Sequence, residues 1–169
     1  DYALKVNDIL AGLPELRALT AKFSCSSPLS NVKGLSKLDS LEVNADMIDL
    51  NCLAEMNLRH LNIAFEETSQ PFPHNTSLTN LVVHVPMRRG TDMEALLDTL
   101  HHLPSLLRLR LVNIDPKWLP KVSKTIPSQL QEFAVYTDNA IGTQMLLDEL
   151  LFALPADLQQ FSVNIPLPS

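Results

Sequence analysis

The sequence predicts an α/β fold in which about seven parallel strands lie side by side, with helices and short turns on one side of the sheet. One observation is a seven-fold repeat of the pattern L-x-x-L-x-φ, where φ is apolar and Phe replaces the second Leu in two copies. The other is a set of apolar helical segments between copies. We call the second apolar residue of each copy its anchor. The anchors are Leu19, Leu41, Leu61, Leu81, Leu109, Phe133 and Phe161, in steps of 22, 20, 20, 28, 24 and 28 residues. Self-similarity at such a spacing is the signature of a repeat architecture.

Each copy of the pattern predicts one strand. Apolar residues alternate over its second half, as a strand with one buried face requires. The first Leu of each copy leads the chain into that strand. Because similar connections join successive strands, we expect them to stack in parallel about 4.8 Å apart. Their outward side chains should then line up in columns across the sheet.

Three connecting segments, 8–14, 91–104 and 144–154, predict helices with one shared design. Each has an apolar stripe, a Leu-Pro pair that stops the helix, a turn of two or three residues and then the strand. Proline cannot continue a helix, and the residue before it favours extended geometry. In the second segment Thr91 and Glu94 predict a capping box. Its apolar stripe consists of Leu96, Leu97, Leu100 and Leu103.

The other connections are shorter. The 20-residue steps before Leu61 and Leu81 leave no room for such helices, so short turns are expected, with Pro71 and Pro73 stiffening one of them. In the segment 115–124, Pro116 is expected to start a short helix and Pro120 to keep it short. Without a linker or a composition shift, residues 1–169 are predicted to form one domain. No helix follows the last strand, so the chain is expected to be part of a longer protein.

These repeats resemble the leucine-rich repeat superfamily over nearly the whole chain. The helix-bearing copies are most similar to its ribonuclease-inhibitor and F-box-associated types. The resemblance implies a short curved solenoid with its strands on the concave side and its helices and turns on the convex side. In that superfamily an Asn usually follows the strand, and its absence here predicts irregular turns. The matching positions are Ser24, Asp46, Glu66, Pro86, Ile114, Asp138 and Pro166.

Composition argues against several classes of function. A formal charge of −6 opposes general affinity for nucleic acid or an anionic membrane. The sequence has no run of 18 apolar residues, so no membrane span is predicted. Four glycines are few for phosphate-cradling loops, and no catalytic or metal-binding motif occurs. We therefore expect a protein that is not an enzyme and that has no cofactor or metal.

The two cysteines, Cys25 and Cys52, are too few for a disulfide framework. We interpret them as free thiols, with one bridge between neighbouring repeats as the alternative. Nothing else in the sequence suggests secretion, so an intracellular location is expected.

The outward side chains of the predicted concave face are mixed and mostly polar. Such a surface suits a protein or peptide partner better than a small ligand, whose pocket would be largely apolar. Arg108, Arg110 and Tyr136 are of the types enriched in binding hot spots and fall on adjacent repeats. We predict that they form one patch, with Glu132 beside it. The alternative is that Arg108 and Glu132 simply pair on a solvated face, which would contribute little.

Two further groups are candidate contacts. His60 and His84 lie on neighbouring predicted strands but in different columns, roughly 8 Å apart from strand spacing and rise, which is too far to share a metal ion. Arg88 and Arg89 predict a second contact on a loop, with a solvated loop as the alternative.

Three hypotheses for function remain open from the sequence. The first is a protein-interaction module that uses the concave face. The second, implied by the resemblance to F-box-associated repeats, is the substrate-recognition domain of a ubiquitin ligase. The third is a structural, self-associating array in which the uncovered last strand pairs with a second copy. The oligomeric state is not predicted.

Overall fold

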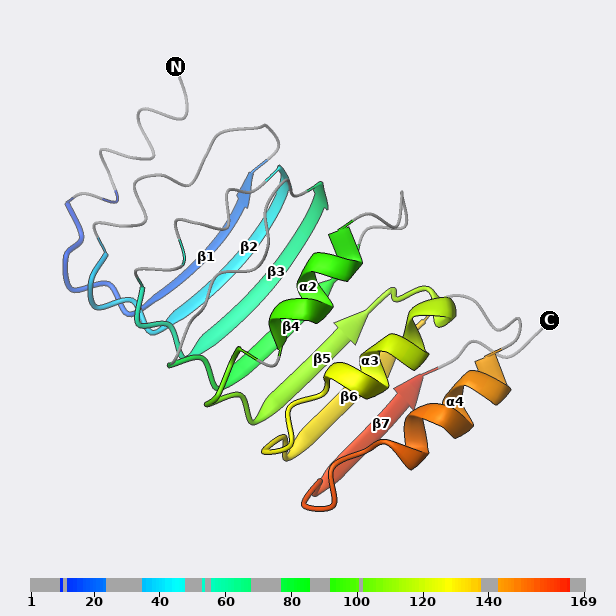
Figure 1. Cartoon of the computed structure of the whole chain (residues 1–169). Helices are drawn as coiled ribbons and strands as arrows, with labels where there is room; N and C mark the ends of the chain where they lie inside the picture. The colour runs from blue at the N-terminus through cyan, green and yellow to red at the C-terminus, as the bar shows by residue number, and fades with distance from the viewer. Residues whose placement is uncertain are drawn as a thin grey trace.

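The computed structural model shows one sheet of seven parallel strands that follow one another in chain order (Figure 1). It describes residues 10, 12–23, 35–47, 53, 56–67, 77–85, 92–100, 102–137 and 143–164 of the 169. The strands are β1 Ala18–Phe23, β2 Ser40–Met47, β3 His60–Glu67, β4 Asn80–His84, β5 Arg108–Val112, β6 Glu132–Tyr136 and β7 Gln160–Asn164. The predicted α/β class and parallel order are confirmed.

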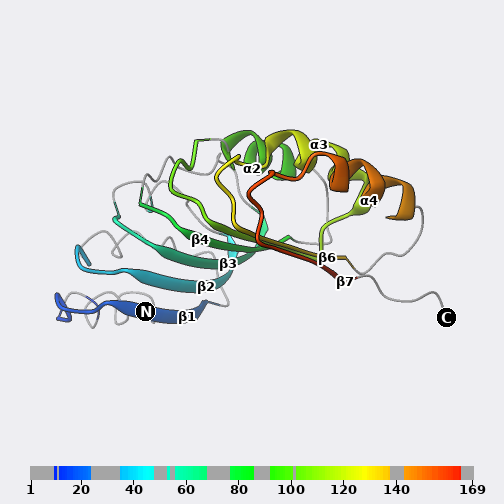
Figure 2. The ribbon, with the colours of Figure 1, turned by 90° about the horizontal axis from the view of Figure 1, so that it is seen from below.

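Three α-helices lie along the C-terminal half of the sheet. They are α2 Asp92–Leu100, α3 Leu119–Thr125 and α4 Thr143–Phe152, and the 3₁₀ helix η3 Pro116–Trp118 leads directly into α3. All three cover the same face of the sheet, as the two ribbon views show (Figures 1 and 2). Helix α3 contacts both α2 and α4. The opposite face of these strands carries no helix in the described part of the chain.

The strand register is the one that the repeat pattern predicts. Anchor lies beside anchor across all six strand pairs, from Leu19 against Leu41 to Phe133 against Phe161. Register matters because a slip by one residue would move every side chain of a strand to the other face. The columns of outward side chains are therefore fixed by the anchors.

The hydrophobic core lies between the sheet and its outer segments. The leucines that lead into the inner strands are buried, as are the inner anchors and the apolar residues two positions after them. The leading leucines are Leu38, Leu58, Leu78, Leu106 and Leu130. At the two ends of the sheet, Leu16 and Leu158 are only partly buried. Each fully buried leucine stabilises the fold by about 1.5–3 kcal/mol relative to exposure, so the inner repeats contribute most.

A recurring tight turn precedes the strands. In Leu13-Pro14-Glu15-Leu16 the N–H of the last residue donates to the carbonyl of the first at 3.1 Å, and Leu103-Pro104-Ser105-Leu106 repeats the bond at 3.1 Å. The equivalent bonds join Leu38 to Leu35, Leu130 to Pro127 and Leu158 to Pro155. Proline in the second position fits because its fixed φ suits that place in a turn. The predicted turn before the strand is confirmed.

The helices end earlier than the sequence predicts. Helix α2 stops at Leu100, three residues before Leu103, and α4 stops at Phe152, two residues before Leu154. After α2 the Leu103 N–H donates to the Leu100 carbonyl, a shorter-range bond typical of a tightened last turn. The residue before a proline disfavours helical geometry, so the backbone leaves the helix before it reaches the Leu-Pro pair.

The strand ends are uneven. Strands β2 and β3 have 8 residues and run through the positions of Asp46 and Glu66, whereas β4 to β7 have 5. After β5 the matching position is Ile114, which is buried. The residue before it, Asn113, has a φ of 62° in the left-handed region, which Asn tolerates better than most residues.

The segment after β5 begins with a side-chain cap. The Asp115 carboxylate accepts a hydrogen bond from the Lys117 backbone N–H at 3.1 Å. It also forms an ion pair with Lys117 Nζ at 2.9 Å. The pKa of Asp115 lies below its ordinary value of 3.8, mainly because the carboxylate accepts a hydrogen bond from the Lys117 side chain. Partial burial opposes it, and the backbone bond adds to it. Trp118 packs against the core beside this cap.

Replacing Asp115 by alanine is expected to lower the free energy of unfolding by about 0.5–2 kcal/mol at pH 7, the usual effect of losing a helix cap. A lowered folded-state pKa means that the charged carboxylate stabilises the fold above pH 3.8, and that this contribution is lost as pH falls through the folded pKa. Urea titrations give the free energies of unfolding of the wild type and Asp115→Ala at pH 7 and pH 3. The two free energies should differ less at pH 3 than at pH 7. Asp115→Asn, which keeps an acceptor oxygen, is the control. An equal difference at both pH values would contradict the role of the charge.

Several sequence-based predictions lie outside the described residues. They include the cap at Thr91, the turn containing Pro71 and Pro73, and the state of Cys25 and Cys52. Of the helix expected over 8–14, the structure describes only Leu10 and residues 12–14.

Candidate functional site

The face of the sheet opposite the helices carries three columns of outward side chains, which we call the polar face. The column before the anchors holds Ala18, Ser40, His60, Asn80, Arg108, Glu132 and Gln160. The column after the anchors holds Thr20, Glu42, Asn62, Val82, Arg110, Ala134 and Ser162. The third column, two residues further along each strand, holds Lys22, Asn44, Ala64, His84, Val112, Tyr136 and Asn164. The two arginines of β5 are exposed, while Leu109 between them is buried. The predicted columns are confirmed.

Arg108 and Glu132 form an ion pair across β5 and β6. Arg108 Nε lies 2.9 Å from Glu132 Oε1, and the two side chains are 53% and 41% exposed. An exposed pair of this kind contributes about 0.2–1 kcal/mol or nothing measurable. The ion pair that the sequence offered as the alternative for these two residues is present. The pair's main effect is local, because it neutralises one arginine and the carboxylate of the patch.

Arg110 lies over the ring of Tyr136. Its guanidinium carbon is 5.6 Å from the ring centroid, a cation–π contact of about 0.5–1 kcal/mol at an exposed site. The register explains the contact. Directly beside Arg110 on β6 is Ala134, whose methyl group leaves room for the arginine to reach the tyrosine two residues further on. No ion pair joins Arg110 to an acidic side chain in the described part of the chain.

The predicted patch therefore exists, but as two differently bonded halves. Arg108 and Glu132 neutralise each other, whereas Arg110 keeps its charge and is positioned by a ring. The repeat pattern predicts that these four residues lie together, but it does not predict the contact between Arg110 and Tyr136. The sequence signal for this contact is the small residue Ala134, which lies beside Arg110 and two residues before Tyr136 on β6.

A shallow hollow of about 180 Å³ opens on the polar face over β4 to β7. Its lining includes Arg108, Arg110 and Glu132, and its short side chains belong to the column after the anchors. The remaining lining residues are Asn80, Leu81, Val82, Leu109, Phe133, Ala134, Gln160 and Ser162. Ala134 is only 9% exposed because longer neighbours stand around it. The hollow results from short side chains in one column beside long ones in the next.

A second hollow of about 350 Å³ lies over β1 to β4. His84 lines it together with Lys22 and Glu42, whereas His60 does not. The register pairs His60 with Asn80 and His84 with Ala64, four residues further along β3. The two histidines are thus about 13 Å apart along the strand direction, so the predicted 8 Å was wrong.

The remaining predicted contacts and groups add little to the site. Arg88 and Arg89 lie outside the described residues. Within the part of the chain that the structure describes, no three His, Cys, Asp or Glu side chains gather as a metal ion would need. None of the described helices is both long and apolar enough to cross a membrane.

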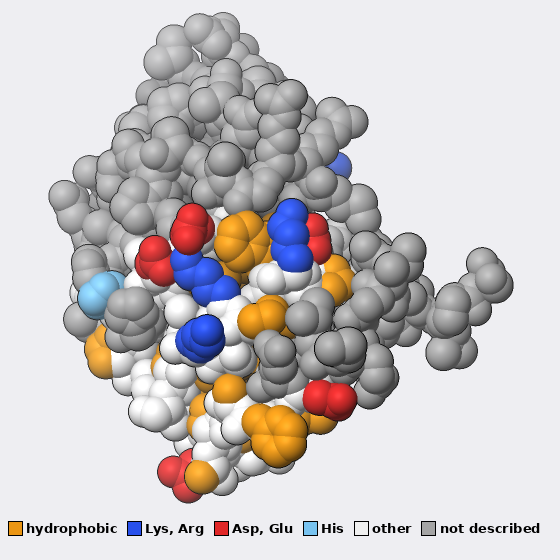
Figure 3. Space-filling view, turned by 45° about the vertical axis from the view of Figure 1, so that its right-hand side comes forward, with side chains coloured by type: hydrophobic (Ala, Val, Ile, Leu, Met, Phe, Trp, Pro, Cys, Tyr) orange, Lys and Arg blue, Asp and Glu red, His pale blue; other side chains and the backbone are white. Residues whose placement is uncertain are grey.

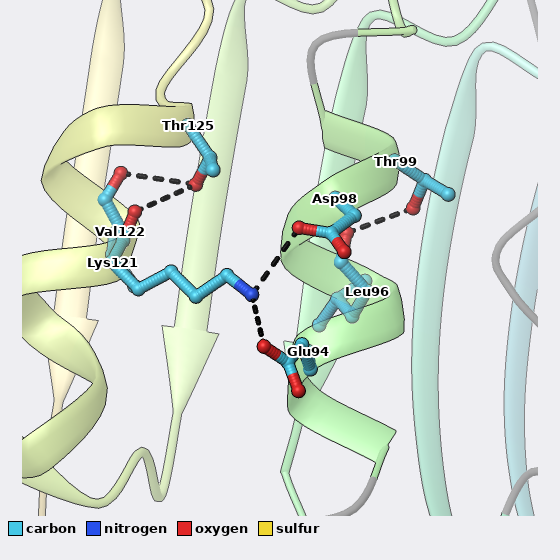
Figure 4. Close-up of polar contacts among 7 residues, drawn as sticks. All are labelled: Glu94, Leu96, Asp98, Thr99, Lys121, Val122 and Thr125. Carbon is cyan, nitrogen blue, oxygen red and sulfur yellow. Dashed lines mark hydrogen bonds and ion pairs between the residues drawn. The ribbon is translucent and has the colours of Figure 1, made fainter.

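The helical side carries ion pairs that link its elements. Lys121 of α3 donates to Glu94 at 2.7 Å and lies 3.3 Å from Asp98, both on α2 (Figure 4). The hydrogen bond with Glu94 raises the pKa of Lys121 above its ordinary value, and Asp98 adds to that effect. Figure 3 shows basic side chains next to acidic ones on the side of the molecule that it views. The charge of Lys121 is therefore offset by two acidic side chains of α2.

The edge formed by α4 and β7 exposes apolar surface. Leu151 is 50% and Phe152 93% exposed. The inward residues Phe161 and Val163 of β7 are partly buried, whereas their counterparts on β6 are fully buried. The last strand therefore has a less complete core than the inner strands.

The comparisons with known proteins give no identification. The chain matches no model of a known protein family, and no curated protein matches it.

Proposed function

We propose that the protein is a non-enzymatic recognition module that binds a protein or peptide partner across the polar face. The observation that carries the proposal is the array of in-register columns on that face, with a hollow that contains Arg108 and Arg110. Arginine and tyrosine are enriched among residues that dominate binding energy. A sheet that is buried on one face and polar on the other presents such side chains on a rigid support.

As part of this proposal, the strand-and-outer-segment units are leucine-rich repeats that stack into a short solenoid with the polar face on its concave side. Seven repeats of the same apolar spacing and the recurring turn before the strands support it. A repeat array buries each unit against its neighbours and leaves one extended surface free for binding.

Affinity capture from a proteome lysate tests the proposal. The immobilised wild-type chain is expected to retain a discrete protein, and Arg110→Ala and Tyr136→Ala should each weaken its binding about tenfold or more, as hot-spot substitutions do. Lys124→Ala is the matched control, because it also removes one exposed positive charge, but from α3 on the helical side. Circular dichroism should show that all variants remain folded.

Two results would reject the proposal. A partner that binds Arg110→Ala, Tyr136→Ala and wild type equally but loses affinity for Lys124→Ala would use the helical side. A chain that retains no protein but converts a substrate would be an enzyme.

A further inference from the structure

We propose that the hollow over β4 to β7 binds a carboxylate side chain presented by an extended acidic segment of the partner protein, with Arg110 as the main contact. This inference rests on the proposed function and specifies the chemistry of the partner at that face. Charge, shape and the fixed position of one guanidinium group carry it.

The hollow is locally positive on a negative protein. Among the described residues, its charged lining consists of Arg108, Arg110 and Glu132, which gives a formal charge of +1 within a chain of −6. Glu132 is bonded to Arg108, so Arg110 supplies the charge that remains. The rest of the chain is negative, so the hollow differs in sign from the chain as a whole. A single positive charge matches one carboxylate better than a phosphate dianion.

The shape of the hollow suits a side chain rather than a whole small molecule. Pockets that enclose a drug-sized ligand have roughly 300–1,000 Å³, whereas this hollow has about 180 Å³. Its short residues Val82, Ala134 and Ser162 form one row across β4, β6 and β7, and Arg110 of β5 stands in that row. In the neighbouring row, Asn80 and Gln160 add amide groups that donate hydrogen bonds to a carboxylate.

Tyr136 prepares Arg110 for this contact. Because the guanidinium lies over the ring, part of the entropy cost of fixing a long side chain is already met before binding. No acidic side chain of the described residues pairs with Arg110, which leaves the N–H edge of its guanidinium without an ionic partner. That edge matches a carboxylate with two parallel hydrogen bonds, the geometry that lysine cannot reproduce.

An extended partner is required because one exposed arginine binds a free carboxylate only weakly. The columns of the polar face continue from the hollow across β3 to β1 with neutral polar side chains such as Asn62 and Asn44. A segment that crosses the strands can contact several columns while it places one acidic side chain in the hollow. The added contacts supply affinity, and the arginine supplies selectivity for charge.

The test is a selection of random dodecapeptides, displayed on phage, against the full wild-type chain. Synthetic copies of the selected peptides are then measured by fluorescence anisotropy with their Asp or Glu replaced by Asn or Gln. We expect the acidic residue to improve the affinity about tenfold, as hydrogen bonds between charged groups do. Against Arg110→Ala the same peptide change should matter less than about twofold, which shows that the two groups act as a pair.

Glu132→Gln gives a second, opposite readout. It frees Arg108 and raises the formal charge of the hollow, so acidic peptides should bind several-fold more tightly. A peptide that binds outside the hollow should have the same affinity for Glu132→Gln as for the wild type. Arg110→Lys keeps the charge but not the paired N–H groups, and it should recover only part of the affinity lost in Arg110→Ala.

The outcomes separate this inference from the proposed function. One outcome overturns the inference and leaves the proposed function standing. In it, binding of the selected peptides depends on Arg110 or on Lys22 of the second hollow, but the acidic residues of the peptides are not coupled to Arg110. If no peptide is selected, or none responds to Arg110→Ala or Lys22→Ala, both are overturned. Coupling to Arg110 together with tighter binding to Glu132→Gln supports the inference.

Discussion

Replacing Leu109 by alanine is expected to lower the free energy of unfolding by about 2–5 kcal/mol, because the change removes a buried side chain and leaves a cavity. Leu109 is the anchor of β5, is 2% exposed and lies between the anchors Leu81 and Phe133 in the sheet. Central strands have core neighbours on both sides, so the surrounding residues have little freedom to fill the space. Urea unfolding of the purified chain measures the loss from the shift of the midpoint.

Arg110→Ala is the matched control for this prediction. Arg110 is the next residue of the same strand but points to the polar face, so its loss should change stability by only about 0.5 kcal/mol. Strand side chains alternate between faces, and a register shifted by one residue would exchange the two results. A severe loss for Arg110→Ala together with a mild one for Leu109→Ala would contradict the register.

The strand stack could be predicted from the sequence because the apolar pattern that produces each strand occurs once in every repeat. A leucine pattern that recurs seven times specifies the buried positions, and burial specifies the register. The columns of the polar face then follow without further information. The same argument explains why Arg108 and Arg110 were correctly placed beside Glu132 and Tyr136.

The features that the sequence did not reveal depend on distances within the sheet or on local backbone geometry. The separation of His60 and His84 was underestimated because their columns are four residues apart along the strand. The contact between Arg110 and Tyr136 required knowing that Ala134 leaves space beside the arginine. The ends of α2 and α4 follow from backbone geometry before a proline, which acts a few residues earlier than the proline itself.

The hollow illustrates the same limit. Short residues in one column and long ones in the next are visible in the sequence once the register is known, but no single residue marks the site. Its chemical character depends on which charges are already paired. The structure gives that information by joining Arg108 to Glu132 and leaving Arg110 over Tyr136.

Phe133→Ala is expected to cost about 3–5 kcal/mol, the upper range for core substitutions. Phe133 is 1% exposed and its ring stacks on that of Phe161, with centroids 5.8 Å apart and an interplanar angle of 27°. These two strands use phenylalanine where the other five use leucine as the anchor. The larger rings fill the space between the sheet and its helical layer near the less complete edge at β7.

Phe161→Ala should cost less than Phe133→Ala although it breaks the same ring pair, because Phe161 is only partly buried. The double variant should show a coupling of about 0.5–1.5 kcal/mol, the contribution of an aromatic pair beyond its burial. Phe133→Leu is the control, since leucine is the anchor of five other strands and refills much of the cavity. Urea titrations of the four variants give all these values. Equal losses for the two alanine variants would mean that β7 is as fully packed as β6, contrary to its exposure in the structure.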